Sequence, residues 1–477
     1  MDAPLPLAED FEAPARADWM ALVEKTLKGE TFETALISKT AGGLPIQPLY
    51  VAGEAQPLGR DLSVRDADRP WDLRTSVIGP DPAKANADAL RDLEGGAASV
   101  LLKIDPTGQD GIAVGSAEGL AKVLDGLLLD LAPVALDAGL LGPKAADWLA
   151  AAAKAAPNAP LAFHLDPLSA FAVAGASPGP IESHIISAAT VAARLSQTYP
   201  KASLFLASGQ AAHEAGGSEA QEIAVMAAAA LAYAKALVRA GLSVEDAYRG
   251  IALGLAVDGE YFTGVAKLRA ARAVWDRIVS ACGVSVPARI EARSSRRMLT
   301  RLDPWTNLLR LTAAGFAAAV GGAQAIVLGS FTDALGKPTE FARRQARNTQ
   351  LVLMEESHLG QVADPAGGAW YLDQLTETLA KAAWAEFQAI EAAGGIVSAL
   401  SSGAVQAKVA QSRAALLKEG RKVLGVSVFR NPDEKPVEVD NTDPAPFAKT
   451  APDVRLPGPD GRCEPLTPIR LSADLEA

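Results

Sequence analysis

The sequence contains few of the residues from which metal sites and disulfide frameworks are built. Its 477 residues include only two cysteines and four histidines. Cys282 and Cys463 lie far apart along the chain and have no histidine at ligand spacing, so neither a disulfide framework nor a zinc site is expected. A reducing compartment is consistent with this composition.

The chain also lacks an excess of positive charge, a secretory signal and a long apolar segment. Its formal net charge is −11 and it has no basic stripe interleaved with aromatic residues, which argues against a nucleic acid partner. The N-terminal residues are acidic and contain prolines, unlike a secretory signal, so we predict a cytoplasmic protein. No membrane span is predicted, because the longest uncharged apolar helical run, between Glu222 and Lys235, is shorter than the roughly 20 residues that cross a bilayer.

Short apolar or β-branched runs alternate with Ala-rich amphipathic stretches along most of the chain. The amphipathic stretches have apolar positions at three- and four-residue spacing, typical of helices, and one begins with Ser218 and Gln221 in a capping-box pattern. Eight such alternations predict an α/β fold of the (β/α)8 TIM-type barrel class, with an open doubly wound sheet as the alternative. The predicted strands begin at Trp71, Ala98, Ala132, Leu161, Ser203, Gly250, Arg289 and Ala325.

Two segments flank the predicted barrel, which is assigned to residues 51–390. Residues 1–50 form an N-terminal arm with an amphipathic helix over residues 18–29, followed by GGLPIQPLY, whose apolar residues have little local core to join. This arm is expected to pack against another surface, either its own barrel or a partner. Residues 391–477 form a C-terminal linker that is helical at first and then rich in proline and acidic residues, which favours an extended tail.

Polar residues are sparse at the predicted strand ends, where the active sites of such barrels lie. His164 and Asp166 end one strand, and His213 follows another in LASGQAAHEAGGSEAQEIA. Either histidine is a candidate acid or base, but ordinary packing at a strand end explains the same residues. Neither a GxGxxG nor a GxxxxGK[ST] phosphate loop occurs. A cluster of arginines after the strand from Arg289 suits a phosphate or a carboxylate, or else a solvated loop, and consists of Arg293, Arg296, Arg297 and Arg301.

The run DALGKPTEFARRQARNTQLVLMEESHLGQVADPAGGAWYLDQLT, from Asp333 to Thr376, closely resembles the signature region of the methylmalonyl-CoA mutase family. GGLPIQPLY, RPWDLR and AKLRAARAVWDRI resemble further elements of that family, so the resemblance covers nearly the whole chain. It implies a barrel that encloses an acyl-CoA while adenosylcobalamin supplies radicals for the isomerisation of methylmalonyl-CoA and succinyl-CoA, a step of propionate metabolism. The cobalamin-binding domain of catalytic chains and its D-x-H-x-x-G string are not found in this sequence.

The family motif S-G-Y-H-M-Q-E-A-G aligns without a gap to SGQAAHEAG in this chain. The alignment places Gln210 at the tyrosine, Ala211 at the catalytic histidine and His213 at the glutamine of the motif. His213 therefore stands two positions after the acid–base residue of the family, and the resemblance implies that the acid–base position is lost.

Other positions that match active-site residues of the family have also changed. Ser76 stands at a strand-end tyrosine, Ala174 at a substrate-holding arginine and His164 at the glutamine of a Q-N-D element. Glu291 and Arg293 stand at the histidine and glutamine of an H-x-Q-x-S-G element. The resemblance therefore implies that this chain contributes no catalytic, cofactor-binding or metal-binding residue.

These departures lead to three hypotheses. The first is a non-catalytic small subunit that forms a heterodimer with a catalytic large subunit and stabilises it, while adenosylcobalamin is bound in the partner and not in this chain. The second is a catalytic acyl-CoA mutase barrel that borrows a separate cobalamin-binding chain and uses His164, His213 or Arg293 in a changed pocket. The third is an assembly or protection factor that binds a mutase transiently.

Overall fold

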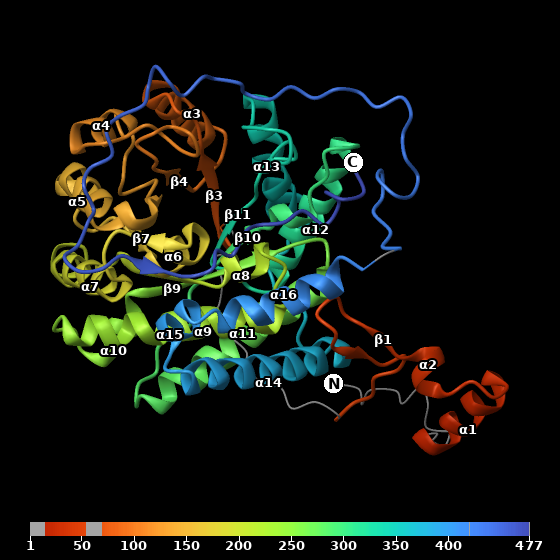
Figure 1. Cartoon of the computed structure of the whole chain (residues 1–477). Helices are drawn as coiled ribbons and strands as arrows, with labels where there is room; N and C mark the ends of the chain where they lie inside the picture. The colour runs from red at the N-terminus through yellow and green to blue at the C-terminus, as the bar shows by residue number, and fades with distance from the viewer. Residues whose placement is uncertain (1–14, 54–68, 419, 477) are drawn as a thin grey trace, which may run out of the picture.

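A computed structural model of the chain describes residues 15–53, 69–418 and 420–476. Its centre is a closed barrel of eight parallel strands in the order β10-β11-β3-β4-β5-β6-β8-β9 (Figure 1). The predicted (β/α)8 barrel is confirmed, and the open doubly wound sheet is excluded because the ring of pairings closes. All eight predicted strands form: β3 (Asp72–Val77), β4 (Ser99–Lys103), β5 (Val134–Asp137), β6 (Ala162–Leu165), β8 (Ser203–Ser208), β9 (Ile251–Val257), β10 (Ile290–Ser294) and β11 (Ala325–Val327).

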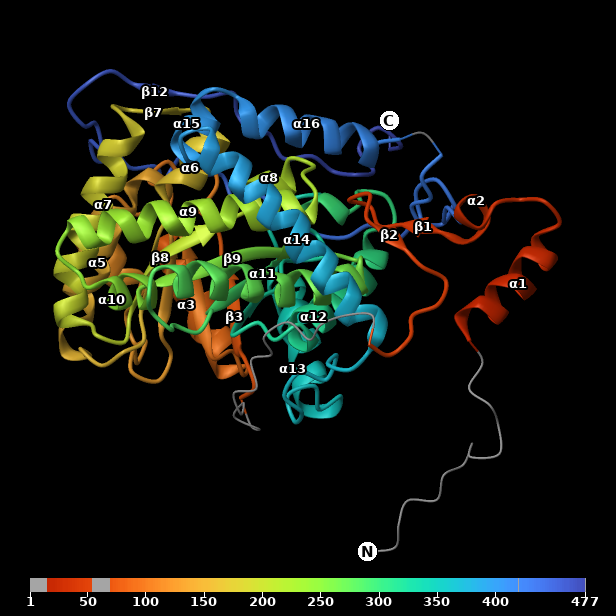
Figure 2. The same ribbon diagram turned by 90° about the horizontal axis from the view of Figure 1, so that it is seen from below.

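Helices cover the outside of the barrel, as expected when each parallel strand is followed by a crossover helix. The long covering helices are α3 (Pro82–Glu94), α5 (Gly142–Ala152), α7 (Ile181–Thr198), α9 (Glu219–Arg239), α11 (Tyr261–Ala281), α12 (Asn307–Val320) and α13 (Glu340–Leu351). Shorter pieces are α4 (Ala117–Val123), α6 (Pro167–Ala174), α8 (Gln210–Glu214), α10 (Val244–Arg249), the single turns η1 (Gly139–Leu141), η2 (Ala153–Ala155), η3 (Arg296–Met298) and η4 (Pro304–Thr306), and the π-helical η5 (Val352–Glu356). Helices α14 (Trp370–Ala392), α15 (Ile396–Ser401) and α16 (Ala404–Leu416) follow the barrel, and α14 crosses α9 and α11 (Figure 2).

Helix α9 is longer at both ends than the uncharged apolar run between Glu222 and Lys235. Its start is the predicted capping box, in which Ser218 Oγ accepts from the Gln221 backbone N–H at 3.4 Å and Gln221 Oε1 accepts from the Ser218 N–H at 3.0 Å. By length and composition α9 is the one helix among the described residues that could span a membrane, and 72% of its apolar window is buried inside the protein. Its apolar surface thus packs against the barrel.

The hydrophobic core lies mainly between the strands and the covering helices. Side chains alternate along each strand, so one set points toward the helices and the other into the barrel. On the outside, the rings of Phe205 in β8 and Tyr233 in α9 pack with centroids 4.5 Å apart. Inside, the apolar layer is small and consists of Leu101, Ala135, Ala162 and Val327. The rest of the interior contains polar side chains, described below.

The signature run from Asp333 to Thr376 covers the loop after β11, α13, η5 and the start of α14. Buried ion pairs fix its helix α13 to α3: Arg343 Nη1 lies 2.7 Å from Asp88 Oδ2, and Arg347 Nη1 lies 2.8 Å from Asp92 Oδ1. These residues hold one helix against its neighbour on the outside of the barrel. The contacts give the run a structural role in the fold.

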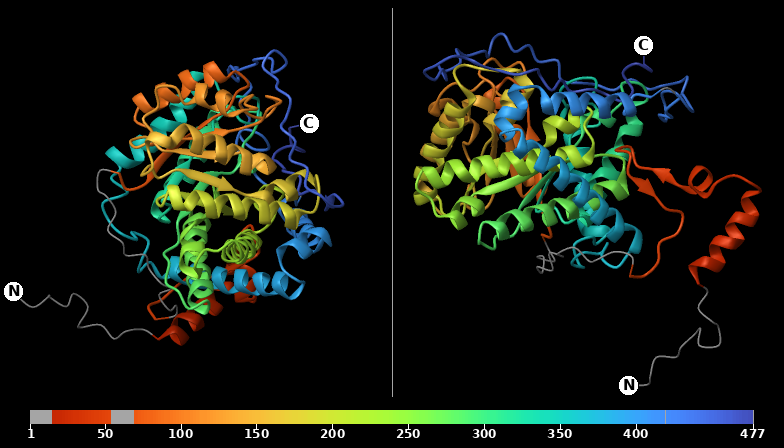
Figure 3. Two further views of the ribbon diagram at one scale, coloured as in Figure 1. Left: turned by 90° about the vertical axis from the view of Figure 1, so that its left-hand side faces the viewer. Right: turned by 60° about the horizontal axis from the view of Figure 1, so that its bottom comes forward.

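The N-terminal arm consists of α1 (Arg16–Leu27), α2 (Phe32–Leu36) and the antiparallel pair β1 (Ser38–Lys39) and β2 (Pro45–Ile46). Helix α1 contains no buried residue and projects away from the barrel (Figure 3). Trp19 of α1 packs edge-on against Phe32 of α2, with ring centroids 5.9 Å apart. The turn after β1 instead lies on the barrel, where a Cβ at Gly42 would stand 2.5 Å from Glu219 Oε2. The arm is therefore attached at its turn and free of the barrel at α1.

The C-terminal tail crosses the face of the barrel formed by the loops that follow the strands. In Figure 1 it runs in dark blue past α3 and α4 and reaches the short strand β7 (Ala176–Ser177), with which β12 (Gly461–Arg462) pairs antiparallel. Backbone hydrogen bonds join this strap (residues 421–476) to loops after four strands. The bonded pairs are Lys449 N–H with Pro106 O, Cys463 N–H with Gly175 O, Ile469 N–H with Glu214 O, and Leu471 N–H with Arg297 O.

Gly179 tests how much the strap contributes to this face. It has φ +91°, and a Cβ there would lie 2.4 Å from the carbonyl oxygen of Leu456 in the strap. We expect Gly179→Ala to displace the strap and to accelerate amide exchange over residues 455–466. The matched control is Gly241→Ala, at φ +106° with nothing within 4 Å of the added Cβ. The control should show only the backbone strain of about 1–2 kcal/mol, and equal exchange in the two variants would contradict the prediction.

Candidate functional site

The interior of the barrel is occupied by charged side chains that pair with one another. Glu291 and Arg293 alternate on β10 with the buried Ile290 and Ala292, so both point inward. Glu291 Oε2 lies 2.5 Å from Arg74 Nη1 of β3, and Glu291 Oε1 lies 2.7 Å from Arg293 Nε. We call this set the interior charge network, and its members are Asp72, Arg74, Asp137, Glu291 and Arg293.

The two arginines of the network have further partners at its edges. Arg74 Nη2 lies 2.5 Å from Asp72 Oδ2, and Arg74 Nε donates to Ser99 Oγ at 2.8 Å. Arg293 Nη1 lies 2.9 Å from Asp137 Oδ2 at the end of β5. The network therefore joins three strands, β3, β5 and β10, across the inside of the barrel.

Burial and mutual attraction have opposite effects on these charges. Burial alone would raise the pKa of Glu291, but Arg293, His164 and Arg74 outweigh it and hold that pKa below its usual range. Burial would lower the pKa of Arg293, and the carboxylates of Glu291 and Asp137 raise it instead. Glu291 and Arg293, the residues at two matched family positions, thus form a persistent ion pair with each other.

His164 lies beside the network without joining it. It has φ +47°, at a point where the register between β6 and β8 is irregular, and its side chain is buried. Its Nδ1 stands 3.8 Å from Glu291 Oε2, beyond hydrogen-bond distance, and has no hydrogen-bond partner among the described residues. Burial lowers the pKa of His164 to about 3, so its imidazole is neutral near pH 7. Asp166 does not complete a catalytic pair, because its Oδ1 accepts from the Tyr233 hydroxyl at 2.6 Å and from the Ser169 N–H at 3.2 Å.

The remaining matched positions do not converge on one pocket. Ser76 lies on β3 two residues after Arg74, on the same face of the strand, and is half-buried. Gln210 donates from Nε2 to the Leu255 carbonyl at 3.2 Å, and the methyl group of Ala211 beside it is buried in α8. Ala174 is exposed at the end of α6.

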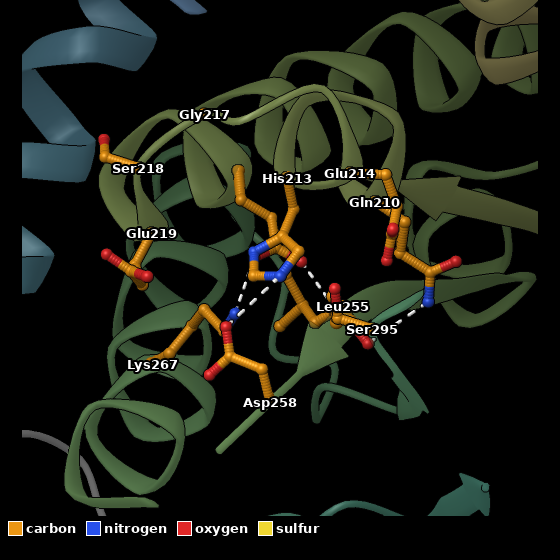
Figure 4. A network of polar contacts seen from close by, with 12 residues as sticks. Gln210, His213, Glu214, Gly217, Ser218, Glu219, Leu255, Asp258, Lys267 and Ser295 are labelled. Atoms are coloured by element: carbon orange, nitrogen blue, oxygen red, sulfur yellow. Dashed lines mark hydrogen bonds and ion pairs between the residues drawn. The ribbon is translucent and has the colours of Figure 1, made fainter. Parts of the chain in front are cut away.

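His213 belongs to a second set of charges that lies between helices and loops, apart from the barrel interior (Figure 4). Its Nδ1 is 3.0 Å from Glu222 Oε2, and its Nε2 is 3.6 Å from Asp258 Oδ2. Lys267 of α11 lies 2.6 Å from the same Glu222 oxygen, and Arg297 lies 3.0 Å from Asp258. We call this set the His213 cluster, and its members are His213, Glu219, Glu222, Asp258, Lys267 and Arg297.

The His213 cluster is buried throughout and holds the loop after β8 against α9 and α11. Burial would raise the pKa of Glu222, but Lys267 and then His213 reverse the effect and lower it to about 2. Arg297 Nη1 also donates to the carbonyls of His213 and Gly217 at 3.1 and 2.9 Å. Arg297 is therefore engaged inside the protein and does not form an anion site with Arg293. Figure 4 shows Gln210 pointing away from this cluster, toward Leu255.

Sequence reasoning missed most of the His213 cluster. Glu222 and Lys267 stand among apolar residues on α9 and α11, at positions that face the barrel, and that placement is the signal that could have marked them. Their pairing joins residues of two different helices, and a local sequence motif cannot predict such a contact. Within the described residues, no group of three or more potential metal ligands is found.

One pocket lies at the N-terminal end of the barrel, opposite the face that the strap crosses. This pocket has a volume of about 190 Å³. Residues at the starts of the strands line it, and its inner end is formed by Arg74, His164 and Glu291. Sites for drug-sized ligands usually measure about 300–1,000 Å³. The pocket is therefore smaller than a cavity that would enclose an acyl-CoA.

Comparison with known proteins agrees with the resemblance of the signature run. The family model for methylmalonyl-CoA mutase matches residues 67–453 of this chain. The chain belongs to the methylmalonyl-CoA mutase family. Its barrel is thus a mutase-family barrel, and inside it Glu291 and Arg293 pair with each other.

The similar proteins within the mutase family have different names. The chain is 38% identical to a protein named methylmalonyl-CoA mutase small subunit from Streptomyces virginiae, over 94% of this chain and 75% of the relative. It is 38% identical to a probable methylmalonyl-CoA mutase small subunit from Mycobacterium bovis, over 78% of this chain and 62% of the relative. It is 29% identical to a methylmalonyl-CoA mutase from Cereibacter sphaeroides, over 91% of this chain and 66% of the relative. The matches thus span between 62% and 75% of these three relatives' own lengths.

His164 should make the stability of the chain sensitive to acid. Its pKa is about 3 in the folded chain and 6.5 ordinarily, so below pH 6.5 the unfolded chain binds a proton that the folded chain does not. Stability is therefore lost as the pH falls from 6.5 toward 3. At pH 4.5 the loss is roughly 3 kcal/mol, because each pKa unit corresponds to about 1.4 kcal/mol.

We expect His164→Asn to reduce this acid sensitivity, measured as the free energy of unfolding in urea at pH 7 and pH 4.5. Asparagine tolerates positive φ, so the backbone at residue 164 can stay unchanged. His358→Asn is the matched control, since His358 also has positive φ, at 52°, but is exposed. The same pH dependence in wild type and His164→Asn would contradict the assignment.

Proposed function

We propose that this chain is the non-catalytic small subunit of an adenosylcobalamin-dependent methylmalonyl-CoA mutase and that it stabilises a catalytic large subunit. The observation that carries the proposal is the interior charge network, in which Glu291 and Arg293 pair with each other and with Arg74 where the family would hold substrate. Removing one partner from a buried ion pair typically costs about 3–5 kcal/mol. An acyl-CoA that opened this network would have to offset that cost.

The position that the resemblance matches to the acid–base histidine of the family offers no group for that chemistry. Ala211 stands at the matched position and offers only a methyl group. His213 is enclosed by Glu222, Asp258, Lys267 and Arg297, with its side chain fully buried. His164, His213 and Arg293, the residues that a changed active site would use, lie in two separate environments. We therefore favour the subunit hypothesis over a catalytic barrel with a borrowed cobalamin chain.

The names of the relatives support the same proposal, since those with 38% identity are called small subunits. In this proposal the partner is a catalytic large subunit, which binds adenosylcobalamin, and the heterodimer works in the cytoplasm on methylmalonyl-CoA. The role of this chain is to stabilise the partner by a permanent contact. A transient assembly factor would not remain at fixed one-to-one stoichiometry through gel filtration.

The arm offers a surface for that contact. Helix α1 stands away from the barrel with Leu22 65% exposed, and Val23 and Leu27 on the same helix are only half-buried. Burial of a large apolar side chain contributes about 1.5–3 kcal/mol, so covering α1 by a partner would be favourable. Exposed contiguous apolar surface usually marks such contacts.

The isolated chain should be inactive and should bind neither ligand of the reaction. We expect no turnover of methylmalonyl-CoA with adenosylcobalamin, because Ala211 cannot transfer a proton and the interior charge network lies across the inside of the barrel. Calorimetry with each ligand should show no micromolar binding, and the co-expressed heterodimer is the positive control. Turnover or micromolar affinity in the isolated, folded chain would contradict the proposal.

The arm should carry much of the affinity for the large subunit. We expect deletion of residues 1–50 to abolish co-purification with the partner while circular dichroism shows a folded barrel. Gly42→Leu should weaken the complex at least about tenfold, because a Cβ at Gly42 stands 2.5 Å from Glu219 and 3.3 Å from Ser218 and would displace the arm. Ala41→Leu is the matched control, since Ala41 is exposed in the same turn and does not have positive φ. Stoichiometric co-purification of the truncated chain would move the interface to the barrel helices.

A further inference from the structure

The pocket at the N-terminal end of the barrel combines apolar walls with polar groups at both ends. Its lining includes Pro133, Ala162 and Ala252 on the walls. Toward the interior it ends at His164 and the interior charge network. At the opening it carries Lys201, two residues before β8, and Arg289, which directly precedes β10. The proposed subunit role uses none of this space.

Two polar side chains of the pocket lining, His164 and Ser203, have a buried atom without a hydrogen-bond partner among the described residues, and His164 is the one at the inner end. Its side chain is 3% exposed, and its Nδ1 has no hydrogen-bond partner among the described residues. An unpaired buried polar atom costs about 1–3 kcal/mol, so a ligand atom that bonds it is stabilised. The residue also has φ +47° at an irregularity of β6, and such strained positions cluster at ligand sites.

Two cations that line the pocket, Lys201 and Arg289, have no carboxylate partner among the described residues. Arg74, Lys201 and Arg289 carry three positive charges, and Asp72 and Glu291 carry two negative ones, so the lining has a net charge of +1 while His164 is neutral. Asp72 and Glu291 are both paired with Arg74. Arg289 donates only to the backbone carbonyl of Arg249 among the described residues, and burial lowers its pKa, followed by repulsion from Arg249.

We propose that this pocket binds a short hydroxy-monocarboxylate. The carboxylate pairs with Arg289 and Lys201 at the opening, and the hydroxyl group hydrogen-bonds to the imidazole of His164 at the inner end. The volume of about 190 Å³ is below the roughly 300–1,000 Å³ of sites for drug-sized ligands. A chain of three to five carbons therefore fits, whereas a coenzyme thioester does not.

The proposal is tested by titrating the full-length chain with 3-hydroxybutyrate, butyrate and 1,3-butanediol and following protein NMR shifts. The diol lacks the carboxylate and butyrate lacks the hydroxyl, so each probe removes one contact. We expect 3-hydroxybutyrate to bind about tenfold more tightly than butyrate, which corresponds to one hydrogen bond of about 1.4 kcal/mol. The diol should bind more weakly than either acid.

Two variants test the two ends of the pocket individually. Arg289→Met should weaken both acids at least about tenfold and leave the diol unchanged, because it removes only the cation. His164→Asn should reduce the preference for 3-hydroxybutyrate over butyrate, while butyrate binding stays within about twofold. Lys235→Met, on the outer surface of α9, is the matched control and should change nothing.

The proposal is overturned if wild type shows no saturable binding of 3-hydroxybutyrate at millimolar concentrations. It is also overturned if Arg289→Met binds both acids as wild type does, or if the His164→Asn variant retains the full hydroxyl preference. These titrations need no large subunit. Loss of the proposed heterodimer would therefore leave this result unchanged, and the two proposals fail separately.

Discussion

The carboxylate of Glu291 is the group on which the interior of this barrel depends. It receives Arg74 from β3 and Arg293 from its own strand, in a space from which water is largely excluded. Each charge would be costly to bury alone, and their mutual attraction compensates only because all three are present together. The two arginines therefore join β3, β5 and β10 across the inside of the barrel.

The His213 cluster, outside the barrel interior, also consists of buried charges that must be paired. Its contacts link the N-terminal arm to the C-terminal strap. Gly42 of the arm lies against Glu219, and Glu219 Oε1 stands 3.4 Å from Arg297 Nη2. The carbonyl of Arg297 accepts a hydrogen bond at 2.8 Å from the N–H of Leu471 in the strap. One buried arginine therefore contacts groups that fix the arm, the loop after β8 and the C-terminal strap. A displacement of the arm therefore acts through these contacts on the loops of this face.

Much of the fold could be predicted because local patterns carry it. Alternating apolar runs marked all eight strands, and the Ser218 and Gln221 pattern marked the start of α9, since both depend on neighbours within a few residues. The candidate site was less predictable. His164, Glu291 and Arg293 were singled out by family resemblance, but their arrangement around Arg74 was not expected. Arg297 was grouped with Arg293 because the two are close in sequence, yet they point into different environments on opposite sides of the barrel wall.

The sequence by itself determined three things: the barrel class, the resemblance of the signature run to the mutase family, and the absence of a histidine at residue 211. Each of these depends only on residue identity and spacing. Only the tertiary structure decided which charges pair. Glu291 meets Arg74 across 217 positions of sequence, and Glu222 meets Lys267 across 45. The reason is physical: burial makes an unpaired charge costly, so the partner of each charge is chosen by what the fold brings within about 3 Å, and sequence distance plays no part in that choice.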